Sequence, residues 1–139
     1  MKVFTIGYGG RTKEELLARL KASGVRTVVD IRLRPDRASM GIWVNAKTAD
    51  KGIEQWLGEA GIGYRSLVEL GNLFLEFPDW QARYGRLLES AGDLLTERLA
   101  QVPQPFCLLC AEKRVAECHR QQVADWLVRH AGAEIEHLE

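Results

Sequence analysis

Short apolar runs that alternate with segments of helical periodicity constrain this fold more than any other feature. Residues 2–8 (KVFTIGY), 25–32 (VRTVVDIR) and 105–112 (PFCLLCAE) are apolar and largely β-branched or aromatic, as expected of buried strands. Between and after them, apolar residues recur at helical spacing, for example Ile53, Trp56, Leu57 and Ala60. Strands alternating with helices predict an α/β layered sandwich with a mostly parallel central sheet flanked by helices.

Local signals place the remaining elements. Thr12 and Glu15 form a T-x-x-E capping box that begins a helix, and Gly24 is a suitable C-terminal cap. We expect a long helix over 80–95, with a possible break at Gly92, and a last helix from about Cys118 to Ala131. Residues 63–70 and 134–139 are candidate strands, whereas 33–50 should be irregular. No repeat or linker divides residues 1–139, so one domain is expected.

Composition narrows the functional classes. The 139 residues include 19 basic and 19 acidic side chains, and a net charge of zero does not indicate nucleic-acid binding over the whole surface. A local basic patch stays possible. The apolar runs are too short to span a bilayer, and the N-terminal residues lack the pattern of a signal peptide, so we expect a cytoplasmic protein. Three cysteines in such a chain favour reduced thiols over a disulfide framework.

Ligands of parallel α/β sheets bind beyond the carboxyl ends of the strands. Three segments follow predicted strands: the glycine turn after Tyr8, DIRLRP after the second strand, and CAEKRVAECHR at 110–120. The glycine turn matches neither the phosphate-binding P-loop nor the dinucleotide fingerprint. A tight turn is its simplest interpretation, although Gly7 and its neighbours would let backbone N–H groups approach an anion. The three segments meet if their strands are neighbours.

Asp30 and Arg32 share one face of the second strand, because side chains alternate with a period of two. Charges at the end of a buried strand are costly unless they are paired or used. A structural ion pair and a role in ligand binding are equally good interpretations.

The cysteines suggest a metal or redox site, but Cys107 and Cys110 should point to opposite faces of a strand. Cys107 is therefore expected in the core, while Cys110 and Glu112 share a face. Cys110, Cys118 and His119 could supply three zinc ligands, yet their spacing matches no common zinc motif. We assign no metal ligand and expect no cofactor.

Arg120 begins the apolar stripe of the last helix, so it should point toward the sheet. A cation in the first turn opposes the helix dipole, and its burial calls for an anion. That anion could be the carboxylate of Glu112 or Asp30, or a ligand phosphate. The same helix start and Arg120 would favour the thiolate of Cys118.

The segments TIGYGGRTKEELLARLKASGVRTVVDIRLRP, YRSLVELGN and CLLCAEKRVAECHRQQVADWL together resemble the family called domain of unknown function 488. The resemblance covers nearly the whole chain, implies an α/β fold with a shared polar site, and implies no activity. Gly9 and Arg37 stand where the family often has serine. Its hallmark positions correspond here to Gly7, Asp30, Arg32, Pro35, Leu70, Gly71, Cys110, Glu112, Cys118, His119 and Arg120.

Three functions fit these residues. In the first, an enzyme acts on a phosphate-bearing small molecule or nucleotide, with nucleic acid as a further possibility. Arg120, Arg32, Asp30 and Gly7 would form the ligand site, Cys118 or Cys110 would be the nucleophile, and Glu112 or His119 would move the proton. The second is rhodanese-like sulfur or phosphoryl transfer at Cys110. The third is a non-catalytic binding or interaction module whose polar cluster is structural. No membrane partner is expected, and the oligomeric state is not predicted.

Overall fold

A computed structural model describes residues 1–38 and 40–139 and contains one five-stranded sheet in the order β3-β2-β4-β1-β5. Every neighbouring pair is parallel, which confirms the predicted α/β class. The strands are β1 (Lys2–Gly7), β2 (Thr27–Asp30), β3 (Gly63–Ser66), β4 (Phe106–Cys110) and β5 (Glu134–Leu138).

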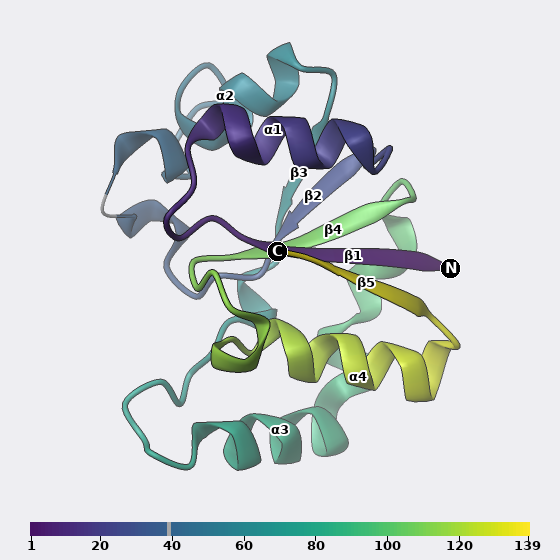
Figure 1. The fold of residues 1–139 in the computed structure, drawn as a ribbon. Coiled ribbons are helices and arrows are strands. Elements are labelled where there is room, and N and C mark those ends of the chain that lie inside the picture. Colours follow the sequence, from purple (N-terminus) through teal and green to yellow (C-terminus); the bar gives the residue numbers. More distant parts are fainter. Residues whose placement is uncertain (39) are drawn as a thin grey trace.

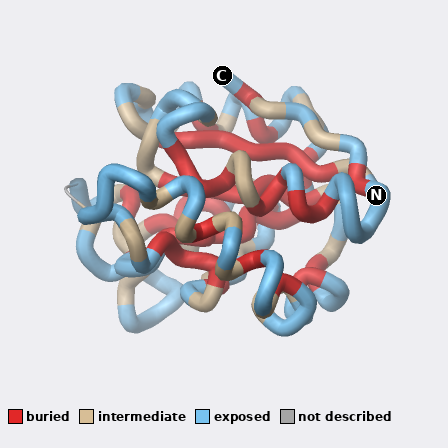
Figure 2. The backbone as a smooth tube through the Cα atoms, turned by 90° about the horizontal axis from the view of Figure 1, so that it is seen from below, coloured by how far each residue is buried: buried red, intermediate tan, exposed pale blue. Residues whose placement is uncertain are grey.

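Helices cover both faces of the sheet (Figure 1). Helices α1 (Lys13–Ala22) and α2 (Gly52–Glu59) lie on one face, and α3 (Trp80–Leu95) and α4 (Arg120–Ala131) on the other. The buried side chains accordingly form two clusters, one on each side. Adjacent residues of β4 alternate between them, with Leu108 in the α3–α4 cluster and Leu109 in the α1–α2 cluster. Figure 2 shows the buried residues running through the middle of the molecule, with exposed residues at its periphery.

The helix boundaries follow mostly from local signals. The hydroxyl of Thr12 accepts a hydrogen bond from the backbone N–H of Glu15 at 3.1 Å, as the capping box predicts. Gly24 and Gly132 end α1 and α4 with φ of 70° and 63°, values that favour glycine. The last helix begins at Arg120 rather than at about Cys118, because Cys118 has an extended backbone after a short turn.

Helix α3 runs unbroken through Gly92, so the considered break is absent from this described helix. A Cβ at Gly92 would overlap the indole of Trp126 on α4. The missing side chain therefore lets the two helices approach closely. None of the described helices is long and apolar enough to cross a membrane.

The strand order brings the three predicted ligand segments together. Strands β2, β4 and β1 are direct neighbours, and Gly7 lies opposite Cys110 in the parallel register. Asp30 at the end of β2 lies opposite Leu109 of β4. The glycine turn, the DIRLRP segment and the loop after β4 thus emerge side by side at one edge of the sheet.

Candidate functional site

A cavity of about 500 Å³ opens at this edge of the sheet. Its lining comes from four parts of the chain: Tyr8 after β1, residues 32–38 after β2, residues 72–76 before α3, and the loop from Cys110 to His119. Cys110 ends β4 and is almost completely buried, so the cavity reaches down to the end of the central strand. Among the predicted residues, Arg32, Cys110, Glu112 and His119 line the cavity.

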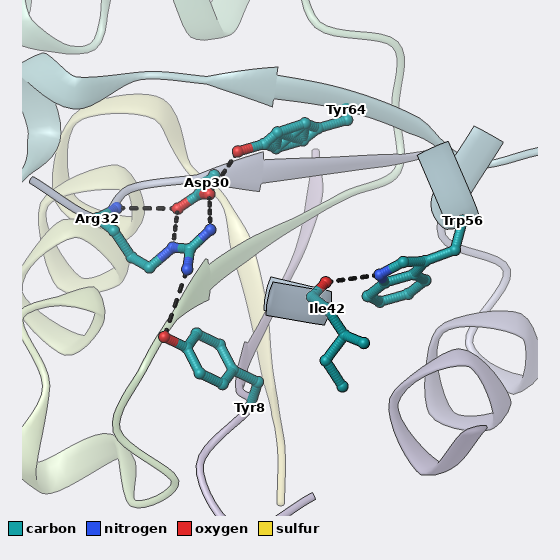
Figure 3. Close-up of polar contacts among 6 residues, drawn as sticks. All are labelled: Tyr8, Asp30, Arg32, Ile42, Trp56 and Tyr64. Atoms are coloured by element: carbon teal, nitrogen blue, oxygen red, sulfur yellow. Dashed lines mark hydrogen bonds and ion pairs between the residues drawn. The ribbon is translucent and has the colours of Figure 1, made fainter. Parts of the chain in front are cut away.

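Asp30 and Arg32 form a buried ion pair beside the cavity (Figure 3). The Nε and Nη2 atoms of Arg32 donate to the two carboxylate oxygens at 2.8 and 2.5 Å, and its backbone N–H donates to Oδ1 at 3.1 Å. The hydroxyl of Tyr64 on β3 donates to Oδ2 at 2.5 Å. All four interactions fix Asp30 within the protein, so the structural ion pair considered from the sequence is present.

The same network extends to Tyr8. The Nη1 atom of Arg32 donates to the Tyr8 hydroxyl at 3.3 Å, and the Tyr8 ring stacks on Trp43 with centroids 4.7 Å apart. Figure 3 shows Trp56 supporting this region through its N–H, which donates to the carbonyl of Ile42 at 2.7 Å. The ring of Tyr8 is thereby held with its hydroxyl at the cavity.

Burial and charge perturb two groups of this network. Burial acts to lower the pKa of Arg32, but the hydrogen bonds and negative charge of Asp30 outweigh it, and the pKa is raised. Burial, together with the charge of Asp30, raises the pKa of Tyr64. Arg32 is therefore a permanent cation and Tyr64 a neutral hydrogen-bond donor across the physiological range.

Arg120 is completely buried against the sheet, as its place in the helical stripe predicts. Its Nε donates to the Thr5 hydroxyl at 3.2 Å. The remaining donors reach the loop after β4: Nη1 donates to the carbonyl of Glu112 at 2.6 Å and to Cys110 Sγ at 3.1 Å, and Nη2 to the carbonyl of Lys113 at 2.9 Å.

Two kinds of anion were considered for Arg120, a carboxylate of the protein and a ligand phosphate, and the carboxylate is not seen among the described residues. Within the part of the chain that the structure describes, Arg120 has no ion pair with Asp30, with the Glu112 side chain or with any other carboxylate. Nor does Arg120 border the cavity, so direct contact with a ligand there is not seen. Main-chain carbonyls replace the expected anion because the loop folds back over the guanidinium. Burial lowers the pKa of Arg120.

Two of the three cysteines meet at this point. The sulfur atoms of Cys110 and Cys118 are joined as a disulfide, which differs from the expectation of reduced thiols. The backbone N–H of Arg120, at the start of α4, donates to Cys118 Sγ at 3.4 Å. Cys107 is free and lies in the α1–α2 core, on the opposite side from Cys110 as its strand position predicts. Burial raises the pKa of the Cys107 thiol.

His119 lies between the cavity and Cys118. Its Nε2 lies 2.8 Å from the carbonyl oxygen of Ile31, which can only accept a hydrogen bond, so Nε2 carries the proton. Nδ1 is then an acceptor, 3.8 Å from Cys118 Sγ. Burial lowers the pKa of His119 to about 4, which makes the ring neutral at physiological pH.

One group of metal-type side chains occurs here in the described residues: Cys110, Glu112 and Cys118, with ligand atoms within 4.8 Å of one another. It differs from the considered set of Cys110, Cys118 and His119 in having Glu112 in place of His119. The guanidinium of Arg120 lies 3.1 Å from one of these sulfurs and already supplies a positive charge there. A dication beside it would be repelled.

Gly7 has a packing role. A Cβ at this position would overlap the carbonyl of Glu112, and it would lie 2.8 Å from Nη1 of Arg120. Only glycine lets the loop after β4 cross the end of β1 at this distance. Gly7 does not line the cavity, so the predicted approach of a ligand to its backbone is not seen there.

Several cavity residues were missed by the sequence reasoning, notably Tyr8, Asn72, Arg34 and Arg37. The Oδ1 atom of Asn72 accepts the backbone N–H of Phe74 at 2.9 Å, which orients its side-chain amide. Asn72 follows the Leu-Gly pair of the motif YRSLVELGN, and that context was its only sequence signal. Tyr8 directly follows a strand end, a position that the same rule for ligand sites covers.

Comparison with known proteins bears on the family of this chain. Searches among curated proteins and among solved structures found no match. A family model described as "Domain of unknown function DUF488" matches residues 12–127, which include Asp30, Arg32 and the whole loop from Cys110 to Arg120. The matched region covers well over half of the 139 residues, and the chain therefore belongs to the DUF488 family.

Proposed function

We propose that this protein is a thiol enzyme in which Cys110 is the nucleophile and the adjoining cavity binds a small anionic ligand. One observation carries the proposal. The completely buried guanidinium of Arg120 donates to Cys110 Sγ at 3.1 Å and has no carboxylate partner in the described residues. Cys110 is also one of the residues that line the cavity.

A buried cation that has no carboxylate partner among the described residues makes ionisation of Cys110 favourable. Coulomb's law gives about 5 kcal/mol of attraction for unit charges 3.1 Å apart at an effective dielectric constant near 20. Removing the thiolate from water offsets part of this energy. The geometry still favours the thiolate over the thiol, as positive groups do at reactive cysteines. Arg120 thus acts through Cys110 and is a positioning residue.

The chemistry of the lining supports an anionic ligand with an apolar part. Arg34 and Arg37 bring cationic side chains to one part of the cavity, and the exposed side chains of Leu73 and Leu75 bring apolar surface to another. Arg34 is paired with Asp36 at 3.4 Å, but this pair is exposed and weak. The side-chain amide of Asn72 adds hydrogen-bond donors. A small molecule or nucleotide fits this site better than a nucleic acid, because the chain has no net positive charge.

Two groups can move a proton at the nucleophile. Glu112 lines the cavity, and its carboxylate lies within 4.8 Å of both sulfurs. The Tyr8 hydroxyl accepts from Arg32, which leaves its own proton free to be donated to a ligand in the cavity. His119 is less suited to the ligand, because its only proton is committed to the carbonyl of Ile31.

The proposed nucleophile requires Cys110 in its reduced form. We therefore propose a reducing compartment, the cytoplasm, as the place of action, with the disulfide to Cys118 as a second state of the site. Sulfur transfer or phosphoryl transfer at Cys110 would use the same thiolate, so both reactions fall within the proposed thiol chemistry.

Alkylation of the reduced protein tests whether Cys110 is a nucleophile and whether the cavity favours anions. Neutral iodoacetamide and anionic iodoacetate are compared, and the modified peptides are identified by mass spectrometry. We expect Cys110 to react first and Cys107 to stay unmodified. At low salt, iodoacetate should alkylate Cys110 faster than iodoacetamide does, and inorganic phosphate should slow the reaction with iodoacetate. Arg37→Ala should reduce the preference for iodoacetate, whereas Arg86→Ala, an exposed change on α3, should not. Alkylation of Cys110 no faster than that of a free cysteine in an unfolded peptide would refute the proposal.

A further inference from the structure

Cys118 has a position that the proposed nucleophile alone does not explain. Its sulfur is bonded to that of Cys110, and both residues are almost completely buried, but Cys110 lines the cavity and Cys118 does not. A ligand in the cavity can therefore reach Cys110, while Cys118 can reach only Cys110. In this arrangement Cys110 is the attacking thiol at the cavity, and Cys118 is a resolving thiol that contacts only Cys110.

Both sulfurs are held by the same residue. The guanidinium of Arg120 donates to Cys110 Sγ at 3.1 Å, and the backbone N–H of Arg120 donates to Cys118 Sγ at 3.4 Å. The second contact places Cys118 at the positive end of α4, where no side-chain oxygen caps the helix. Each sulfur can thus carry negative charge when the bond between them opens, as a disulfide that cycles requires.

His119 provides a proton acceptor for Cys118. Its unprotonated Nδ1 lies 3.8 Å from Cys118 Sγ, while Nε2 is fixed by the carbonyl of Ile31. The Cys118 thiol can donate toward Nδ1 as its sulfur approaches Cys110. The His119 ring also lies in a T-shaped contact with Tyr84, whose hydroxyl donates to the carbonyl of Leu70 at 2.6 Å. The contact with Tyr84 and the hydrogen bond to Ile31 together fix the orientation of the His119 ring.

We propose, resting on the proposed function, that Cys110 and Cys118 form a redox couple that reduces a small anionic organic disulfide. The cavity of about 500 Å³ has room for an organic disulfide, and Arg34 and Arg37 suit a carboxylate on it. Of the glutamates that share the lining, Glu112 and Glu117 lie in the loop after β4 and Glu76 lies before α3, so the cationic part is that formed by residues 32–37.

The reaction balances in two exchanges. The Cys110 thiolate attacks one sulfur of the substrate R–S–S–R′, a Cys110–S–S–R bond forms, and R′–S⁻ leaves and takes a proton from solvent. Cys118 then attacks the Cys110 sulfur as its proton moves to Nδ1 of His119, the bond to R–S breaks, and R–S⁻ leaves and takes up that proton, which returns His119 to its neutral form. The substrate gains two electrons and two protons, and the protein ends as the disulfide. A small dithiol returns it to the reduced form by two further exchanges.

The test uses dithiobis(nitrobenzoate), an anionic aromatic disulfide whose released thiolate is coloured, on the reduced protein. The wild type should release about two equivalents and end with the Cys110–Cys118 disulfide and no bound aryl group. Cys118→Ser should release about one equivalent and keep the aryl thiol on Cys110. Mass spectrometry of the intact protein and its peptides reads both results.

The outcomes separate this inference from the proposed function. A wild-type protein that keeps the aryl thiol on Cys110 overturns the redox couple and leaves Cys110 as the nucleophile. Cys110→Ser protein that reacts as fast as the wild type overturns both. Dithiobis(nitrobenzoate) and the cationic disulfide cystamine differ in leaving-group reactivity, so the ratio of their rates is divided by the same ratio for a cysteine in an unfolded peptide. The corrected ratio should be at least roughly ten at low salt, and Arg37→Ala should shrink it. A corrected ratio near unity, or faster oxidation of the couple by an organic hydroperoxide, would overturn the substrate class.

Discussion

Replacing Asp30 by asparagine should destabilise the protein strongly. The carboxylate is completely buried and accepts four hydrogen bonds, two at each oxygen: the backbone N–H and Nε of Arg32 at Oδ1, and Nη2 of Arg32 and the Tyr64 hydroxyl at Oδ2. Asparagine keeps one oxygen and places an amide N–H₂ against two donors. It also leaves the buried guanidinium without a counter-charge. Removing one partner of a buried pair costs about 3–5 kcal/mol.

Urea unfolding of Asp30→Asn measures this cost. A domain of this size is stable by roughly 5–15 kcal/mol, so the loss takes a large share of the total. Asp36→Asn is the matched control, because Asp36 makes the same kind of pair with Arg34 on the surface, and there we expect little measurable change. Equal stability of Asp30→Asn and Asp36→Asn would show that the buried network does not hold the end of β2, and would refute the reasoning.

Three other changes have expected outcomes. Burial lowers the pKa of His119 from 6.5 in the unfolded chain to about 4 in the folded protein. As pH falls, the imidazole is therefore protonated in the unfolded chain before it is protonated in the folded protein. The stability that the neutral ring contributes is complete above about pH 6.5 and is lost as pH falls toward about 4. The free energy of unfolding should fall by about 2 kcal/mol between about pH 7.5 and about pH 5 through this group. In urea titrations over the same range, His119→Gln protein should lose about 2 kcal/mol less than the wild type. On α3, Gly92→Ala should destabilise by about 1–3 kcal/mol through overlap with Trp126, whereas Gly85→Ala, with open space around it, should stabilise by up to about 1 kcal/mol in the same assay. Gly7→Ala should displace the loop after β4 and slow the alkylation of Cys110, and an unchanged rate would show that the loop does not depend on this contact.

The strand and helix pattern of this chain could be predicted because each element carries a local signal. The β-branched runs, the capping box at Thr12 and the glycine at 132 all act within a few residues of their position. The burial of Arg120 followed in the same way from the helical period. The ion pair of Asp30 and Arg32 was one of the two interpretations that followed from the period of two in a strand and the cost of burying charge.

The contacts between segments were not predictable, because they depend on strand order and on the path of a loop. Two of the partners of Arg120 are the carbonyls of residues 112 and 113, and a carbonyl is common to every residue type. The meeting of Cys110 and Cys118 depends on how the intervening loop turns back. Tyr64 reaches Asp30 only because β3 pairs with β2. Helix α4 started later than expected because Cys118 continues the extended loop.

The central claim is that Arg120 holds Cys110 as a thiolate, and a pH titration of the thiolate's ultraviolet absorbance tests it most directly. The titration uses Cys118→Ser protein, in which no disulfide to Cys118 can form. Cys107 should not interfere, because burial raises its pKa.

We expect a midpoint at least about one unit below 8.5, the usual value for a free cysteine. Adding Arg120→Gln should raise the midpoint, and adding Arg120→Lys should raise it less, provided that circular dichroism shows both proteins folded. A midpoint near or above about 8.5 that is the same with arginine and with glutamine would contradict the account.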